Sequence, residues 1–145
     1  MPAPEYLRLM LVGYLITIAV ETAVLVALLA RRHSIRVRVF AGVWVTACTY
    51  PVVWLVLPPL FHADQRWLYL LVAETFAPVA ECAIFWLAFV RPHTLRKQPV
   101  TNDAEEVWEP PPGNRETLRD FATITLANLC SFGLGEVLTG WGVWR

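Results

Sequence analysis

The stretch WLYLLVAETFAPVAECAIFWLAFV, from Trp67 to Val90, determines the fold class of this chain. It is long enough to cross a bilayer, because a helix of about 20 apolar residues spans roughly 30 Å of hydrocarbon. It also contains two acids, Glu74 and Glu81, with Pro78 between them. A charge inside such a helix costs about 2.5–3.5 kcal/mol on insertion scales, so it usually faces protein or water rather than lipid. The stretch therefore predicts a membrane protein with a polar interior.

Three further apolar segments extend this prediction to the whole chain. Of the 145 residues, 57% are hydrophobic and 17% are charged, and soluble domains contain roughly 25% charged residues. Arg31 and Arg32 follow the first apolar run instead of preceding it, as in a retained first span rather than a cleaved leader. We predict an all-α fold, with residues 1–145 forming one polytopic membrane domain. Its four transmembrane helices should form an antiparallel bundle, with spans at about 6–30, 39–57, 67–90 and 118–140 and a polar linker at about 91–117.

The positive charges predict the orientation of this bundle. Of the 12 Lys and Arg residues, four lie between 31 and 38 and five between 91 and 119, whereas Arg8, Arg66 and Arg145 flank the opposite side. Loops rich in Lys and Arg stay in the cytoplasm. We expect both basic loops, including the linker 91–117, to be cytoplasmic and both termini to be outside. In a bacterium this location would be the cytoplasmic, or inner, membrane.

Polar residues from several spans are expected to meet inside the bundle. With the spans laid antiparallel, Glu21, Glu81 and Asn128 fall at a similar depth, close to Thr46 and Thr49 of the second span. No Lys, Arg or His lies in the middle of any span. A buried acid without a cation keeps its proton, and it can exchange that proton for a cation. We therefore predict a cation- or proton-binding site formed by Glu21, Glu74, Glu81 and Asn128, which would serve proton- or cation-coupled transport.

A second interpretation gives the acids a structural role. Protonated acids can hydrogen-bond to neighbouring helices, and such bonds contribute about 0.6 kcal/mol each in membranes. Small residues recur every four positions in the fourth span, which favours close helix packing. These predicted packing residues are Thr123, Ala127, Ser131 and Gly135. The chain would then be an accessory or structural subunit of a larger membrane complex, with its acids paired to cations of a partner.

Other classes of site have little support in the sequence. Cys48, Cys82 and Cys130 lie in apolar segments without a C-x-x-C pair or a histidine at the same depth, which argues against a metal site. Ser131 and the cysteines have no His or Lys base nearby in the sequence, and neither G-x-S-x-G nor H-E-x-x-H is present, so we predict neither catalytic residues nor a cofactor. Basic residues are not interleaved with aromatic ones as they are on a nucleic-acid surface. The expected partners are the lipid bilayer and either further copies of this chain or the subunits of a membrane complex.

Overall fold

The computed structural model describes residues 3–91 and 113–141, and this part of the chain consists of helices joined by short loops and turns. Its α-helices are α1 (Ala3–Leu28), α2 (Ile35–Pro51), α3 (Arg66–Phe85) and α5 (Asn114–Gly140). Shorter π- and 3₁₀-helical segments are η1 (Val52–Val56), η2 (Pro58–Leu60), η3 (Ala63–Gln65) and η4 (Trp86–Val90). Together they give four helical segments long and apolar enough to cross a membrane: Pro4–Leu28, Ile35–Leu60, Arg66–Val90 and Asn114–Gly140.

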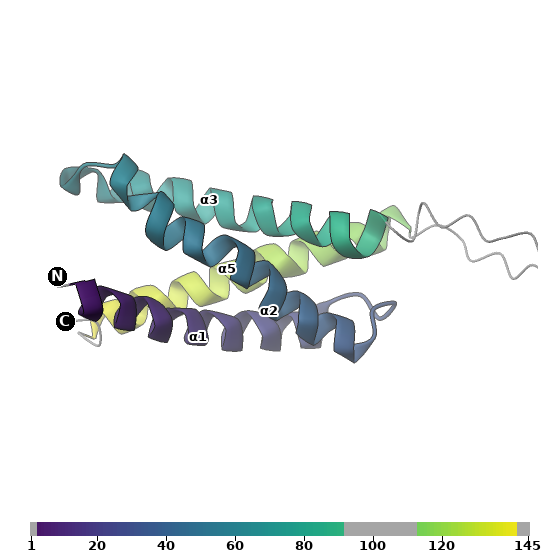
Figure 1. Ribbon diagram of the computed structural model, residues 1–145. Helices are drawn as coiled ribbons and strands as arrows, with labels where there is room; N and C mark the ends of the chain where they lie inside the picture. The colour runs from purple at the N-terminus through teal and green to yellow at the C-terminus, as the bar shows by residue number, and fades with distance from the viewer. Residues whose placement is uncertain (1–2, 92–112, 142–145) are drawn as a thin grey trace, which may run out of the picture.

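The helices surround a common axis. Helix α1 packs against α2 and α5, and α3 packs against the same two helices, so α1 and α3 lie on opposite sides. The start of α1, the end of α5 and the α2–α3 connection lie at one end of the molecule (Figure 1). We call this the terminal end. The α1–α2 loop and the start of α5 lie at the other end, which we call the loop end.

Helices α2 and α5 each begin about four residues earlier than predicted from the sequence. Helix α2 starts at Ile35 instead of residue 39, because the Ser34 hydroxyl accepts a bond from the N–H of Val37 and caps the helix. Helix α5 starts at Asn114 instead of residue 118. The predicted linker 91–117 therefore includes the first turn of α5, and its residues 92–112 lie outside the described part of the chain.

The prolines of the second segment change its pitch before they end it. Pro51 lies inside the helix, which continues beyond it as the π-helical segment η1. There the N–H of Leu57 bonds to the carbonyl of Val52, five residues earlier. Pro58 and Pro59 then convert the chain to the short 3₁₀ segment η2, because neither has an N–H to continue the helical ladder.

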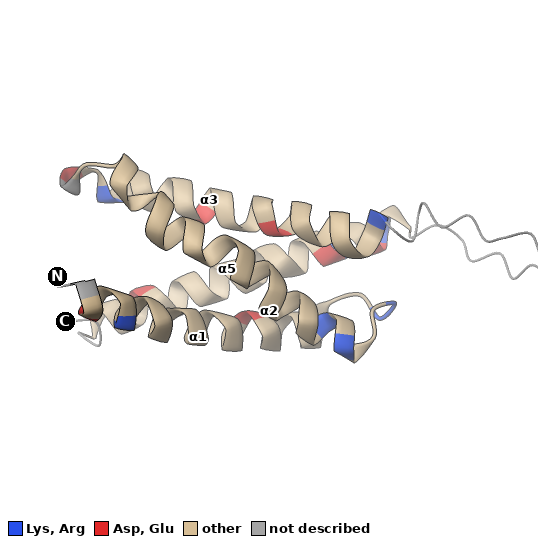
Figure 2. Ribbon diagram, in the orientation of Figure 1, with Lys and Arg blue, Asp and Glu red and all other residues tan. Residues whose placement is uncertain are grey.

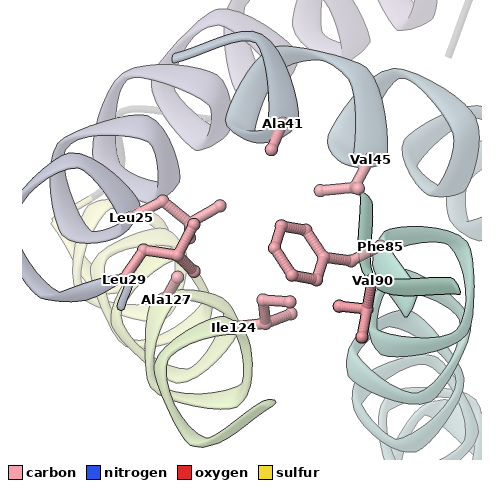
Figure 3. Packing of buried hydrophobic residues seen from close by; sticks show 8 residues of the cluster. All are labelled: Leu25, Leu29, Ala41, Val45, Phe85, Val90, Ile124 and Ala127. Carbon is pink, nitrogen blue, oxygen red and sulfur yellow. The ribbon is translucent and has the colours of Figure 1, made fainter. Parts of the chain in front are cut away.

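An apolar cluster fills the bundle on the side of the loop end. Figure 3 shows its side chains pointing inward from all four helices around the Phe85 ring. Phe85, Leu29 and Ile124 have no exposed surface. The cluster consists of Leu25, Leu29, Ala41, Val45, Phe85, Val90, Ile124 and Ala127. Because interiors packed in this way leave few voids as large as a water molecule, the cluster separates the middle of the bundle from the loop end.

A buried ionic group closes the loop end next to this cluster. Asp120 of α5 has a fully buried side chain and accepts bonds from the guanidinium of Arg32 and the backbone N–H of Ala30. The imidazole Nε2 of His33 lies 3.0 Å from the same carboxylate, and its ring meets Phe85 edge-on at 5.3 Å between centroids. The α1–α2 loop is thus tied to α5 through one carboxylate.

Arginines at the loop end cap the last turn of α1. The Arg38 guanidinium donates to the carbonyls of Val26, Ala30 and His33. The Nε–H of Arg119 donates to the carbonyl of Leu28. The final carbonyls of a helix have no partner within it, and basic side chains commonly satisfy them. These two arginines therefore have a structural role besides any contribution to membrane orientation.

Gly42 of α2 lies directly against Thr22 of α1. A Cβ atom at this position would lie 2.8 Å from the Cα of Thr22, so the α1 backbone would have to move. We expect Gly42→Ala to lower the free energy of unfolding by about 1–3 kcal/mol, which is typical of overpacking. Chemical unfolding in detergent micelles measures this value.

The matched control for Gly42 is Gly133 in α5, where an added Cβ would meet nothing within 4 Å. Gly133→Ala should be neutral or slightly stabilising, because alanine favours the helix by up to about 1 kcal/mol over glycine. Equal loss of stability in both variants would contradict the close contact of α1 with α2 at Gly42.

Candidate functional site

A cavity of about 500 Å³ occupies the bundle between its middle and the terminal end. It is lined by residues of α1, α2, α3 and α5, so a single chain is sufficient to form it. Its rim includes Arg66 and Glu136, an exposed ion pair with 3.4 Å between nitrogen and oxygen. Figure 2 shows that basic residues lie toward the helix ends, whereas acidic residues also occur midway along the helices. The cavity thus leads from the surface to acids in the bundle.

Glu21 of α1 lies at the inner end of this cavity and is 3% exposed. Its two oxygens accept bonds from two other helices. The Thr46 hydroxyl of α2 donates to Oε2 at 2.6 Å, and the Ser131 hydroxyl of α5 donates to Oε1 at 2.7 Å. This one carboxyl group therefore connects α1, α2 and α5.

Glu81 of α3 lines the same cavity and is also 3% exposed. The Thr49 hydroxyl of α2 donates to its Oε1 at 2.7 Å, and the Asn128 amide of α5 donates to its Oε2 at 2.7 Å. Glu81 therefore connects α3, α2 and α5. Glu21, Glu81 and their four partners, Thr46, Thr49, Asn128 and Ser131, form the layer that we call the polar floor.

The hydroxyl groups of the polar floor can serve either protonation state of the acids. Each hydroxyl has one hydrogen and two acceptor lone pairs. Thr46 lies within hydrogen-bond distance of both Glu21 and the carbonyl of Gly42, and Ser131 lies within reach of both Glu21 and the carbonyl of Asn128. With an ionised Glu21, these hydroxyls donate to it. With a protonated Glu21, one hydroxyl can turn to its backbone carbonyl and accept the acid's hydrogen.

Glu74 lies in a different environment from the other two acids. It lines the cavity on α3 and is half-buried, and no hydrogen bond or ion pair to it is found among residues 3–91 and 113–141. The structure therefore brings Glu21, Glu81 and Asn128 together in the polar floor and leaves Glu74 apart, facing the open volume.

Aromatic rings form much of the cavity wall, and the sequence alone did not indicate them. The rings of Tyr50 and Trp54 stack with 5.7 Å between centroids, and Tyr6 packs against Trp54. Tyr6 and Tyr69 donate their hydroxyl hydrogens to the carbonyls of Trp54 and Val53. The two prolines of η2 lack an N–H, so they leave these carbonyls short of backbone donors. The sequence signal for this wall was the proline pair Pro58–Pro59, because the carbonyls one turn before it need donors from elsewhere.

The small residues of α5 have different roles along the helix. Thr123 and Ala127 are buried near the loop end, where the Thr123 hydroxyl lies 3.4 Å from the carbonyl of Leu28 in α1. Ser131 belongs to the polar floor. Gly135 borders the cavity, and a Cβ there would meet nothing within 4 Å. Close helix packing was expected at Gly135, but in the described part of the chain the structure has open volume there.

The three cysteines do not assemble into a site. Cys48 and Cys130 are exposed, and Cys82 points its thiol toward the carbonyl of Phe121 at 3.8 Å. Within residues 3–91 and 113–141, no group of three His, Cys, Asp or Glu side chains is arranged to hold a metal ion. The polar floor and the cavity above it are therefore the strongest candidate site in the described part of the chain.

Comparisons with known proteins do not assign the chain to a family. No family model, curated protein or solved structure gives a significant match. The function is therefore inferred from the geometry of the cavity and the polar floor.

Proposed function

We propose that this chain is an integral membrane protein whose four long helices cross the bilayer as an antiparallel bundle. The distribution of apolar side chains supports this proposal. In the most apolar window of each helix, only 11–28% of the residues are buried inside the structure, so most of these residues keep some exposed surface. A soluble protein rarely exposes a continuous apolar surface of this extent, whereas lipid would cover it.

We also propose that the loop end lies in the cytoplasm and the cavity opens to the outside. This orientation follows from the basic residues at the loop end, such as Arg31 and Arg36. Single cysteines at the exposed positions Arg31 and Asp64 test it in a variant without native cysteines. A membrane-impermeant thiol reagent should label position 64 in intact cells and position 31 only after lysis. Labelling of position 31 in intact cells would reverse the orientation.

For the function, we propose proton- or cation-coupled transport through the carboxylate site of the polar floor. The observation that carries this proposal is the position of Glu21 and Glu81 at the inner end of a cavity that reaches the surface. Acids within membrane helices characteristically mark ion pathways and proton relays. The hydroxyl pairs of the polar floor can accommodate the gain and the loss of a proton, as a relay requires.

The accessory-subunit interpretation is weakened in one respect. It expected the acids to pair with cations of a partner protein. Within the chain, however, all four oxygens of Glu21 and Glu81 already accept hydrogen bonds.

The apolar cluster between the polar floor and the loop end would block passage of an ion through the bundle in this state. Such a block is expected for a carrier that opens to one side of the membrane at a time.

Proton movement in liposomes tests the proposed function. Purified protein is reconstituted with a trapped pH-sensitive dye, and a membrane potential is imposed with and without opposing gradients of potassium, sodium or tetramethylammonium. We expect at least one condition to give proton movement above that of protein-free liposomes. Background rates under every condition, together with copurification of the native protein in a stable hetero-complex, would favour the accessory-subunit role instead.

A further inference from the structure

We propose that the cavity binds an organic ammonium ion, with its positive charge at Glu74 and its apolar body against the aromatic wall. This inference deepens the proposed function by naming the chemical class of the ligand, and it depends on the cavity being a cation site. It comes from three observations: a carboxylate without a partner among residues 3–91 and 113–141, fixed aromatic rings, and the cavity volume.

The first observation is the charge pattern within the cavity. Glu21 and Glu81 are occupied by the hydroxyl and amide groups of the polar floor. Glu74 has no such partner in the described residues, although it is half-buried in the same cavity. The basic side chain of the lining is Arg66 at the rim, and it pairs with Glu136. A ligand that reaches Glu74 therefore meets negative charge, which favours a cation over an anion.

The second observation is the rigidity of the aromatic wall. The Tyr6 and Tyr69 hydroxyls bond to backbone carbonyls, so both rings are held in place. Gly13 of α1 allows Tyr50 to lie against this helix, because a Cβ there would be 2.4 Å from the Tyr50 hydroxyl oxygen. Aromatic faces attract ammonium groups and apolar ligand surface alike. Rings that are already fixed lose little conformational freedom when a ligand binds.

The third observation is the volume of about 500 Å³. Cavities of about 300–1,000 Å³ typically hold drug-sized organic molecules, and a bare metal ion would leave most of this volume to water. An apolar body of that size would displace water from the aromatic wall. The ligand class that matches the charge, the wall and the volume is a monovalent amine or quaternary ammonium ion with a ring or branched hydrocarbon body.

Equilibrium dialysis of the purified full-length protein tests this inference with benzyltrimethylammonium as the probe. The controls are tetramethylammonium, which has the charge without the ring, and neopentylbenzene, the uncharged carbon isostere. We expect the probe to bind at least about tenfold more tightly than either control. A tenfold difference requires only a modest contribution to the binding free energy from the ring, which tetramethylammonium lacks, and from the charge, which neopentylbenzene lacks. Binding of the probe no tighter than that of tetramethylammonium would overturn the inference.

Substitution of Glu74 locates the bound charge. Glu74→Gln should weaken binding of the probe by about tenfold or more and leave the thermal unfolding temperature unchanged, because Glu74 has no partner to lose in the described part of the chain. Glu116→Gln, at the exposed loop end, is the matched control and should bind like the wild type. Equal affinity in the wild type and Glu74→Gln would overturn the placement at Glu74.

The outcomes separate this inference from the proposed transport. Proton movement with inorganic cations but no binding of benzyltrimethylammonium would overturn the organic ligand and leave the transport proposal standing. Tight, Glu74-dependent binding of the probe without any proton movement would support the ligand class and overturn coupled transport.

Discussion

Asp120→Ala should be among the most destabilising substitutions in this chain, lowering the free energy of unfolding by about 3–5 kcal/mol. This is the range observed when one partner of a buried ion pair is removed. The alanine variant would lose the acceptor of the Ala30 N–H and would leave Arg32 and His33 next to the apolar cluster without their carboxylate. Unfolding in mixed micelles with increasing SDS measures the change.

Glu116→Ala provides the matched control for Asp120→Ala. Glu116 pairs with the same Arg32, but at 3.6 Å and with its side chain 52% exposed. Exposed ion pairs contribute about 0–1 kcal/mol, so this variant should stay close to the wild type. Asp120→Asn should fall between the two, because the amide keeps one oxygen for the Ala30 N–H and loses the charge. Equal stability of all three variants would contradict the proposed role of the buried carboxylate.

Glu81→Gln should reduce proton movement in liposomes by at least about tenfold, because an amide cannot take up and release the proton that such a relay requires. The fold should remain. The glutamine oxygen can accept from Asn128, and its amide can donate to Thr49 while the Thr49 hydroxyl bonds to the carbonyl of Val45. The free energy of unfolding should therefore change by no more than about 1 kcal/mol, the contribution of a typical hydrogen bond.

Glu81→Leu separates the two roles of this residue. It removes the acceptor of one Asn128 N–H, and a buried donor without a partner costs about 1–3 kcal/mol. Loss of stability in Glu81→Leu but not in Glu81→Gln, with loss of proton movement in both, is the expected pattern. If Glu81→Gln moved protons at the wild-type rate, Glu81 would be an interhelical hydrogen-bonding group only.

The helices and much of the polar floor could be predicted from the sequence, because both depend on the lengths of the apolar runs and on the positions of residues within them. Long apolar runs set the four helical segments, and depth within them placed Glu21, Glu81 and Asn128 at one level. Thr46 and Thr49 followed from their position in the second span. Their pairing, with Thr46 on Glu21 and Thr49 on Glu81, depends on how the helices rotate about their axes. The weak periodicity of these apolar runs does not specify that rotation.

Other features depend on contacts between distant residues and could not be predicted from the sequence. Asp120 lies 88 residues from Arg32, and nothing near it in the chain marks it as buried. The contact between Gly42 and Thr22 can be predicted only when the distance between the axes of α1 and α2 is known. Gly135 borders a cavity, although its spacing from Thr123, Ala127 and Ser131 indicates a packing face, because spacing along one helix does not specify how near the neighbouring helices lie.

Exchange of a proton between Glu81 and water of the cavity is tested most directly by ¹³C NMR of the Glu81 carboxyl carbon. Protein with ¹³C-labelled glutamate is titrated in lipid nanodiscs, and the Glu81 signal is assigned by its absence in Glu81→Gln. We expect this signal to move between the protonated and ionised positions within the pH range in which the protein stays folded. A signal that remains at one position throughout that range would contradict this proton exchange and identify Glu81 as a fixed structural hydrogen-bonding group.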